Sequence, residues 1–272
     1  MAGDRLSIVT DEVSQDLLEC RGFLDEVGLR GVEVRGVGGR RVPDLAPSDV
    51  QALTSWRSDG IRINALSPGI FKGAIDDVER ADRELADTLP RTLDLAASLG
   101  VEQVIAFSFE DPSRRGLARA ADALARAAAT CAAAGVRLLI ENEPGFCAST
   151  GPELEALLES AGDPSLFVNW DPANSTDRSE TGLRDAVERL GARIRNVHVK
   201  NGRGRVEDLL LDYGPLADGE VDWPAHLRAL DAIGYEGPLA LETHFPPLRE
   251  SSRQLVSELR AMIAESRPGE AR

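Results

Sequence analysis

The sequence predicts a single-domain (β/α)8 TIM barrel, an α/β fold built on a closed parallel sheet. Short β-branched or apolar runs alternate with longer helical patterns along the chain, which is typical of consecutive βα units. Eight such units fit into 272 residues, and this count favours a closed barrel over an open doubly wound sheet. No GxGxxG motif follows the first strand, so a dinucleotide-binding fold is not indicated.

The eight strands are assigned to short runs rich in β-branched and apolar residues, which favour extended backbone. In chain order they are LSIVT at 6–10, GVEVR at 31–35, IRINAL at 61–66, QVIAF at 103–107, VRLLIE at 136–141, LFVNWD at 166–171, IRNVHV at 194–199 and PLALE at 238–242. The GVGGR segment after the second strand is interpreted as a mobile loop, because a single Gly-rich turn is a weak nucleotide-binding signal.

The segments between the strands carry apolar residues at three- and four-residue spacing, the pattern of helices that bury one face. The clearest cover residues 74–99, 115–134, 152–160, 183–190, 223–233 and 248–264. Glycines at positions 28, 60, 100, 135 and 234 end helical segments before the next strand, as a left-handed C-cap favours. We therefore expect a barrel over residues 1–265 and a disordered C-terminal tail at 266–272.

The charge balance bears on the partners of the protein. The formal net charge is −15 and the pI is near 4.7, so nucleic acids and anionic membranes would be repelled unless a local basic groove existed. Because no run of Lys and Arg supplies such a groove, we expect a small-molecule substrate and neither nucleic acid nor membrane as partner. The Ala-rich segment 118–134 leaves open whether it packs within the monomer or against a second subunit of a homo-oligomer.

The N-terminus and the cysteines indicate the compartment. MAGDRLSIVTDEVSQD has acidic residues where a signal peptide needs a basic region and an apolar stretch, and no apolar run reaches membrane-spanning length. Cys20, Cys131 and Cys147 are an odd number without CxxC spacing, which argues against a disulfide framework or a thiolate metal site. These observations predict a cytoplasmic protein.

Polar residues stand at the ends of the last four predicted strands, where a barrel brings the carboxyl ends of its strands to one face. They are Glu141, Asp171, His198 and Glu242. Three buried carboxylates would repel one another and resist ionisation unless a cation neutralised them. An oxygen-rich site with one imidazole suits one divalent metal ion, with Mn²⁺ expected first and Mg²⁺, Co²⁺ or Zn²⁺ as alternatives.

Each of these residues also has an ordinary structural explanation. A lone acid at the end of a barrel strand is often a loop cap or half of a salt bridge, and a lone strand histidine is usually a hydrogen-bonded core residue. Four such residues on four successive strand ends are poorly explained as coincidence. Lys200, one of only two lysines in the chain, shares the strand face of His198 by period-two spacing. It is expected to meet a substrate oxygen, or else to pair with Glu242 or Asp171.

The segments VRLLIENEPG, VNWDPAN, NVHVKN and LADGEVDWPAHLRALDAIGYEGPLALETHF resemble the xylose isomerase-like TIM barrel superfamily of sugar phosphate isomerases and epimerases. The chain is similar in layout to tagatose/psicose 3-epimerases and inosose dehydratases, and more distantly to endonuclease IV. The resemblance extends over nearly the whole chain, including GLRGVEVRG, and its final third is the most specific part.

The resemblance implies roles for the four strand-end residues. In the epimerases of this superfamily a Glu, Asp, His and Glu at the ends of strands five to eight bind one divalent cation, which corresponds to Glu141, Asp171, His198 and Glu242. The two glutamates also act there as acid and base on opposite sides of the sugar, so Glu141 and Glu242 inherit a catalytic role. The chain departs from the epimerases at Asn174, where they often carry a substrate-binding histidine. An amide cannot carry a proton near neutral pH, so this departure weakens the assignment to a ketose epimerase.

Further polar residues near the strand ends are expected to bind substrate. Two of them stand two residues after the catalytic glutamates and therefore share their strand faces. The candidates are Lys200, Asn174, His244, Glu143, Glu33 and Asn64. By contrast, Trp170 should point into the helix layer, and His226 is assigned a structural role.

These residues predict a metal-dependent isomerase or epimerase that acts on a sugar or keto-polyol. With the metal as Lewis acid, a glutamate would remove the proton next to a carbonyl and form a metal-stabilised enediolate. Return of a proton to the other face gives epimerisation, and return to the neighbouring carbon gives isomerisation. Loss of a β-leaving group gives a dehydratase or lyase. All these outcomes share the first step, so the motif does not separate them.

Two further classes are compared with this hypothesis. The first is hydrolysis of DNA, as in endonuclease IV. By that resemblance it would need a three-metal site rich in histidines and a basic surface for the duplex. Three histidines and a charge of −15 do not provide them. A barrel that keeps the metal ligands but serves as a binding or regulatory subunit is compatible with the sequence.

Overall fold

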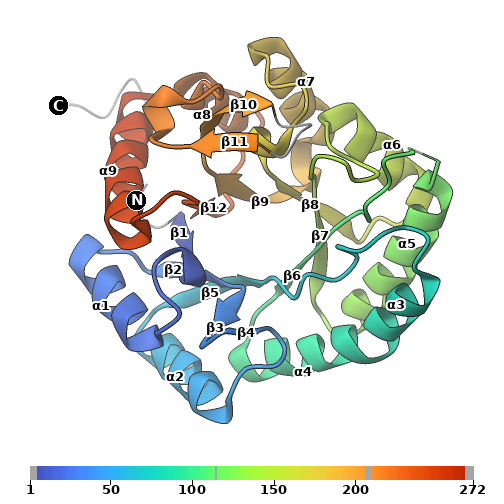
Figure 1. Cartoon of the computed structure of the whole chain (residues 1–272), viewed down its shortest axis with the longest axis horizontal. Helices are drawn as coiled ribbons and strands as arrows, with labels where there is room; N and C mark the ends of the chain where they lie inside the picture. The colour runs from blue at the N-terminus through green and yellow to red at the C-terminus, as the bar shows by residue number, and fades with distance from the viewer. Residues whose placement is uncertain (1–4, 114, 206–209, 267–272) are drawn as a thin grey trace.

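The computed structural model describes residues 5–113, 115–205 and 210–266. Within them, eight parallel strands close into a barrel in the order β1-β12-β9-β8-β7-β6-β5-β2. Helices surround this barrel as an outer ring (Figure 1). The predicted single-domain (β/α)8 TIM barrel is therefore confirmed. The tail predicted to be disordered falls outside the described residues, except for Ser266, which ends the last helix.

All eight predicted barrel strands are present, and their ends differ from the predicted ones by at most one residue. They are β1 (Leu6–Val9), β2 (Gly31–Val34), β5 (Arg62–Leu66), β6 (Gln103–Ala106), β7 (Arg137–Glu141), β8 (Leu166–Trp170), β9 (Ile194–Val199) and β12 (Leu239–Leu241). Neighbouring strands pair in parallel around the ring, with register shifts between Val32 and Glu33 of β2 and between Val168 and Asn169 of β8.

The helices cover the outside of the barrel. They are α1 (Leu17–Val27), α2 (Pro47–Ser58), α3 (Val78–Arg83), α4 (Leu89–Leu99), α5 (Leu117–Ala133), α6 (Gly151–Ala161), α7 (Glu180–Leu190), α8 (Trp223–Ala232) and α9 (Leu248–Ser266). All except α9, which follows the last strand, lie between successive barrel strands. The helices other than α3 bury apolar residues on one face. Within the described residues, no helix is long and apolar enough to cross a membrane.

The sequence predicted one continuous helix over 74–99, and this prediction is wrong. A π-helical turn at Glu84–Thr88 separates α3 from α4. Pro90 stands in the first turn of α4, where it lacks an N–H and its ring crowds the preceding turn, so a wider turn accommodates it. Within this turn, a side-chain oxygen of Glu84 accepts a hydrogen bond from the backbone N–H of Phe71 at 2.7 Å, which anchors the loop after β5.

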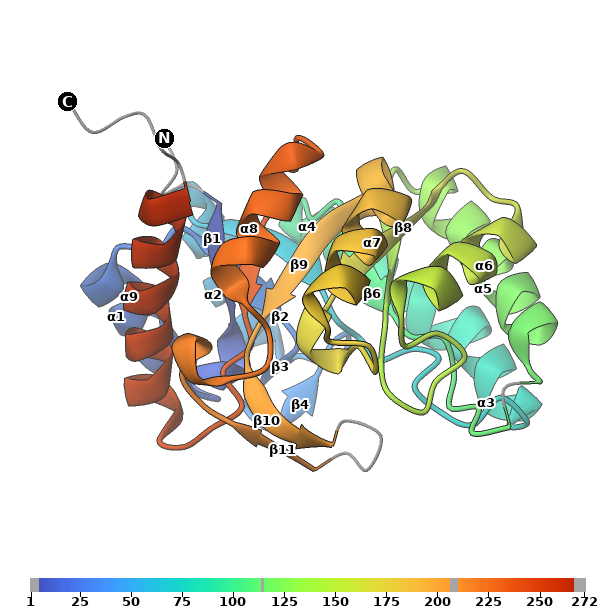
Figure 2. The ribbon, with the colours of Figure 1, turned by 90° about the horizontal axis from the view of Figure 1, so that it is seen from above.

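Two antiparallel hairpins extend beyond the barrel strands: β3 (Gly36–Val37) with β4 (Arg40–Arg41), and β10 (Gly202–Arg205) with β11 (Leu210–Tyr213). The first hairpin is the GVGGR segment, so its interpretation as a mobile loop is corrected. Gly38 and Gly39 form the turn with φ values of 58° and 75°, which glycine adopts without steric cost. Figure 2 shows both hairpins at the same end of the barrel, the end toward which β9 runs.

The interior of the barrel has its own small apolar layer. Ala65, Ile105 and Leu139 form a buried cluster with the partly buried Phe167, separate from the large core that includes the helices. These four residues come from β5, β6, β7 and β8. Because side chains alternate along a strand, Leu139 faces the same side as Glu141, two residues nearer the carboxyl end. The apolar layer therefore closes the barrel beneath the polar residues of the strand ends.

Candidate metal centre

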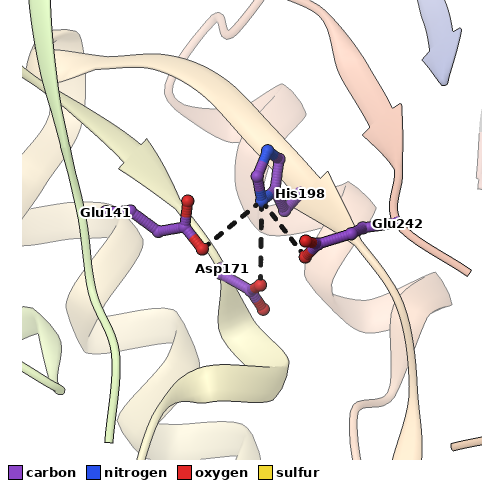
Figure 3. A group of neighbouring side chains, drawn as sticks. All are labelled: Glu141, Asp171, His198 and Glu242. Carbon is purple, nitrogen blue, oxygen red and sulfur yellow. Dashed lines mark ion pairs between the residues drawn. The ribbon is translucent and has the colours of Figure 1, made fainter. Parts of the chain in front are cut away.

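Four side chains from four neighbouring strands converge at the carboxyl end of the barrel. Glu141 ends β7, Asp171 follows β8, His198 lies in β9 and Glu242 follows β12. Each is at most 4% exposed, and their potential ligand atoms all lie within 4.8 Å of one another. Figure 3 shows the three carboxylates approaching the His198 ring from different directions. The barrel thus brings together the four residues that the sequence singled out as a metal site.

The separations within this cluster fit a cation better than direct hydrogen bonds. His198 Nδ1 lies 3.4 Å from Glu242 Oε2, 3.6 Å from Glu141 Oε1 and 4.0 Å from Asp171 Oδ2. These distances exceed normal hydrogen-bond lengths, and His198 Nδ1 is buried with no hydrogen-bond partner among the described residues. An imidazole nitrogen facing carboxylate oxygens at this spacing leaves room for a divalent ion held about 2.0–2.2 Å from each ligand.

The electrostatics of the cluster also favour a bound cation. Burial raises the pKa of Asp171 above its ordinary value, although the charge of Lys200 opposes this rise. Burial alone would lower the pKa of His198, but the surrounding carboxylates, with Glu33 foremost, raise it well above its ordinary value. The carboxylates therefore stabilise positive charge among them, which a divalent ion would supply.

Lys200 follows β9 directly and reaches the same cluster. Its Nζ lies 2.8 Å from Asp171 Oδ2 and 2.8 Å from Glu242 Oε2, and the residue is only 3% exposed. The period-two spacing from His198 explains why both side chains enter the barrel. The salt bridges that the sequence left open as an alternative are therefore present, on the same face as His198.

A second polar group surrounds Glu242 on the β1 and β2 side, and the sequence interpretation missed three of its members, Asp11, Glu12 and Arg35. Arg35 contacts three carboxylates: its Nη1 donates to Glu242, its Nη2 donates to Glu12 at 2.6 Å and its Nε donates to Asp11 at 3.0 Å. The only available sequence signal was that Arg35 stands two residues after Glu33 and so shares its strand face.

His244 completes this second group. Its Nδ1 lies 3.1 Å from Glu12 Oε1 and its Nε2 lies 3.3 Å from Glu242 Oε1. Its backbone adopts φ 61°, the left-handed region that side chains other than glycine seldom occupy, and such strain is concentrated at functional sites. Although Glu12, Glu242 and His244 could together hold a metal ion, the guanidinium of Arg35 already neutralises both glutamates.

Two more predicted residues lie beside the metal cluster. Asn174 Nδ2 lies 3.4 Å from Glu141 Oε1 and donates to the backbone oxygen of Asn142 at 3.1 Å. Glu143 pairs with Lys72 at 3.0 Å, and burial raises its pKa. Both face a pocket of about 130 Å³ lined by Arg35, Lys72, Glu141, Glu143, Pro144, Asn174, Lys200, Leu211, Tyr213, Glu242 and His244.

The other two predicted substrate-binding residues lie outside this pocket. Glu33 is 1% exposed and sits beneath it, where its carboxylate contacts the His198 ring. Asn64 lies on β5 next to Ala65 of the interior layer, so its own side chain faces the opposite side of the sheet. The structure therefore separates both residues from this pocket: Glu33 lies deeper in the barrel, and Asn64 points to the other side of its strand.

The hairpin β10–β11 forms one wall of the pocket. The ring of Tyr213 packs against the ring of His244 with centroids 4.9 Å apart, and Lys200 Nζ lies 5.8 Å from the Tyr213 centroid. A larger cavity of about 410 Å³ lies on the outside of the barrel between α7 and α8 and contains none of the four cluster residues. The small pocket is therefore the one that adjoins the four-residue cluster.

As expected, Trp170 and His226 are structural. Trp170 is fully buried, and its indole Nε1 donates to Nε2 of His226 on α8 at 3.1 Å. Burial lowers the pKa of His226 to about 4, which keeps the ring neutral and able to accept this bond. The pair joins the sheet to the helix layer.

The comparisons with known proteins agree with this architecture. The family described as xylose isomerase-like TIM barrel matches residues 23–265. L-ribulose 3-epimerase from Mesorhizobium japonicum (strain LMG 29417 / CECT 9101 / MAFF 303099) is 27% identical over 218 residues, which cover 74% of this chain and 68% of that protein.

Three solved structures are similar in fold. A structure of L-ribulose 3-epimerase has a TM-score of 0.78 at 21% identity and covers 98% of this chain and 99% of its own. The probable 3-DHS dehydratase AsbF from Bacillus anthracis has a TM-score of 0.78 at 16% identity, and the match covers 94% of this chain and 98% of that one. The IOLI protein with a bound zinc atom has a TM-score of 0.76 at 16% identity, and the match covers 96% of this chain and 97% of that one. At these identities the structures show the fold alone.

Proposed function

This chain belongs to the xylose isomerase-like TIM barrel family, and on that premise we propose that it is a divalent-metal-dependent epimerase or isomerase of a small sugar or keto-polyol. The family relative L-ribulose 3-epimerase supports the reaction class. The observation that carries the proposal is the buried set of Glu141, Asp171, His198 and Glu242 at the base of a pocket. The imidazole nitrogen in its centre has no hydrogen-bond partner in the part of the chain that the structure describes.

Glu141, Asp171, His198 and Glu242 are proposed to hold one divalent ion. When bound, the ion would act as a Lewis acid toward the carbonyl and hydroxyl oxygens of the substrate. Three carboxylates and one imidazole form a mixed donor set that suits Mn²⁺, Co²⁺, Mg²⁺ or Zn²⁺. Mn²⁺ stays our first expectation, and the zinc atom of the IOLI structure supports a divalent site on this fold without choosing the metal.

Glu141 and Glu242 are proposed to move the proton. They come from β7 and β12, with β8 and β9 between them, and they approach His198 from opposite sides (Figure 3). Burial raises the pKa of Glu242, but Lys200 and His244 bring it well below its ordinary value. The pKa of Glu141 is also lowered, against its burial, by His198. Both are therefore carboxylates in the free protein, which is the form that accepts a proton.

Lys200 and Asn174 are proposed to orient the substrate between the two glutamates. Removal of the proton next to a carbonyl places negative charge on oxygen, and the Lys200 ammonium beside Glu242 would stabilise that charge. The Asn174 amide beside Glu141 can donate a hydrogen bond but cannot transfer a proton. Proton transfer is therefore assigned to the glutamates, and the amide is assigned to binding.

A dehydratase or lyase is the second candidate, because loss of a β-leaving group would follow from the same first proton removal. The observation that favours it is Asn174 in place of a histidine. The fold is also shared with the probable 3-DHS dehydratase AsbF. A non-catalytic metal-binding barrel would leave every candidate substrate unchanged.

Cytoplasmic location, the absence of nucleic-acid and membrane partners, and the oligomeric state stay predictions from the sequence.

The test uses the step that all catalytic outcomes share. The protein, loaded with Mn²⁺, is incubated in deuterated water with L-ribulose, other ketoses and inosose-like compounds, and the products are examined by NMR. Deuterium at the carbon next to the carbonyl, without change of skeleton, supports epimerisation or isomerisation, and loss of water supports the dehydratase. If no compound incorporates deuterium or loses water while the metal is bound, the non-catalytic barrel is favoured.

A further inference from the structure

The side chain of Glu33 extends across the barrel interior and contacts the ring of His198. It lies in β2, which is separated from β9 around the ring by β1 and β12. Its Oε2 and Oε1 lie 3.0 Å and 3.2 Å from His198 Nε2, the nitrogen that faces away from the carboxylate cluster. Both residues are at most 2% exposed. The two ring nitrogens of His198 therefore face different partners.

Two asparagines fix this contact from below. Asn196 Nδ2 donates to Glu33 Oε2 at 3.1 Å and to Asn169 Oδ1 at 2.9 Å, while Asn169 Nδ2 donates to Glu141 Oε2 at 3.0 Å. Asn196 stands two residues before His198, and Asn169 stands two residues before Asp171, so both face the interior one layer below the cluster. This layer connects β2, β7, β8 and β9 through hydrogen bonds alone.

A carboxylate oxygen accepts hydrogen bonds, so the contact with Glu33 is satisfied when His198 carries its proton on Nε2. Asn169 Nδ2 also lies 3.2 Å from this nitrogen, but that amide donates to Glu141 at the shorter distance of 3.0 Å. A neutral imidazole with a proton on Nε2 has a free lone pair on Nδ1, the nitrogen that faces Glu141, Asp171 and Glu242. Carboxylate partners of this kind orient metal-binding histidines and raise their basicity.

We propose that Glu33 is a positioning residue, which fixes the ring orientation and tautomer of His198 so that Nδ1 is the nitrogen offered to the metal. This inference rests on the proposed metal-dependent function. It replaces the sequence expectation that Glu33 binds substrate, since the residue lies beneath the pocket and does not line it. Asn196 supports Glu33 by holding Oε2 toward the ring.

The test is calorimetric titration with Zn²⁺ alone, on wild-type protein freed of metal and on Glu33→Ala and Glu33→Gln. We expect Glu33→Ala to weaken Zn²⁺ binding about 10- to 100-fold, the usual effect of removing such a partner. Glu33→Gln keeps an oxygen that accepts from Nε2–H, so it should recover most of the affinity. Gln103→Met is the matched control, because it removes a part-buried hydrogen bond from Gln103 on β6 to the backbone oxygen of Asn64 on β5, away from His198.

Histidine-selective nitrogen-15 NMR of the Zn²⁺-loaded protein gives a second readout that does not depend on a variant. The chain has only three histidines, so the His198 signals can be assigned with single substitutions. We expect His198 to carry its proton on Nε2 and to bind Zn²⁺ through Nδ1. A proton on Nδ1 overturns the inference even if Glu33→Ala fails to fold.

The outcomes separate the two proposals. If wild-type protein does not bind Zn²⁺, Mn²⁺ or Co²⁺, the proposed function falls, and the positioning role falls with it. If wild-type protein binds Zn²⁺ and folded Glu33→Ala binds it equally well, only the positioning role is overturned. An equal loss of affinity in Gln103→Met would also overturn it, because the effect would then reflect barrel stability.

Discussion

Lys200 Nζ lies 2.8 Å from Glu242 Oε2, which places an ammonium group against a proposed metal ligand and proton acceptor. Both side chains are buried, so water screens their interaction only weakly. The contact lowers the pKa of Glu242, and Asp171 together with Glu242 raises that of Lys200, which keeps both groups charged. The ammonium therefore stabilises the carboxylate and, at the same time, opposes the approach of a second cation.

Lys200→Met should separate these two effects. Removal of the ammonium leaves the cluster more negative, so we expect divalent metal to bind at least about tenfold more tightly. Turnover should fall by about 10²-fold or more, since the charge that develops on the substrate oxygen loses its partner. Calorimetry and steady-state kinetics measure the two effects, with Lys200→Arg as the charge-preserving control. Weaker metal binding in Lys200→Met would contradict this electrostatic interpretation.

Glu242→Gln should abolish turnover and leave the fold intact. The amide has the same shape as the carboxylate but cannot accept the proton, and the loss of a positioned base costs about 10²–10⁴-fold in rate. Circular dichroism and kinetics with a validated substrate test the expectation, and Glu102→Gln on the surface serves as the control. Activity near the wild-type level in Glu242→Gln would remove this residue from the mechanism.

Metal binding should raise the thermal stability of the wild-type protein and not that of His198→Ala. A ligand at about 100 times its Kd stabilises the folded state by about 2.7 kcal/mol, which corresponds to a Tm increase of about 5–10 °C in a protein of this size. The comparison is made by calorimetric scanning with and without Mn²⁺. An equal increase in His198→Ala would mean that the residue is not a ligand.

His226 should make the fold less stable at mildly acidic pH. Burial lowers its pKa to about 4 in the folded state, while an unfolded histidine titrates near 6.5. The unfolded state therefore binds the proton first, so the contribution is complete above pH 6.5 and is lost as the pH falls toward 4. The full loss amounts to about 3 kcal/mol of unfolding free energy.

Urea unfolding of wild-type protein and His226→Gln at several pH values between 7.5 and 4.5 measures this contribution. Gln stays neutral over this range and offers an oxygen to Trp170 Nε1, so His226→Gln should depend less on pH than the wild type. The difference between the two proteins isolates His226 from the other groups that titrate. Parallel pH profiles would show that the ring is not held neutral by its burial.

Much of the fold could be predicted because its signals are local. β-branched runs, helical spacing and glycine C-caps act over a few residues, and they located all eight barrel strands. The hairpin of Gly36–Arg41 gave no such signal, because its two-residue strands are too short for an apolar alternation. The break between α3 and α4 was also missed, since Pro90 sits inside an otherwise continuous helical spacing.

The strand-end residues of the candidate site could be chosen from the sequence because a closed barrel must bring them to one face. Glu141, Asp171, His198 and Glu242 needed only the strand assignments to be grouped. Their metal-binding and catalytic roles stay proposals, which the experiments above address.

Tertiary structure alone decided which partners these residues have. Glu33 reaches His198 across 165 positions of the chain, and Arg35 reaches Glu242 across 207. Such contacts depend on the depth of each side chain in the barrel and on the strands that lie opposite one another. The sequence by itself therefore determined the barrel and the residues at its mouth. Only the folded chain placed Glu33 beneath the pocket and Arg35 among three carboxylates. The depth of a side chain in the barrel, and the strand that it faces across the interior, are set only when the sheet closes.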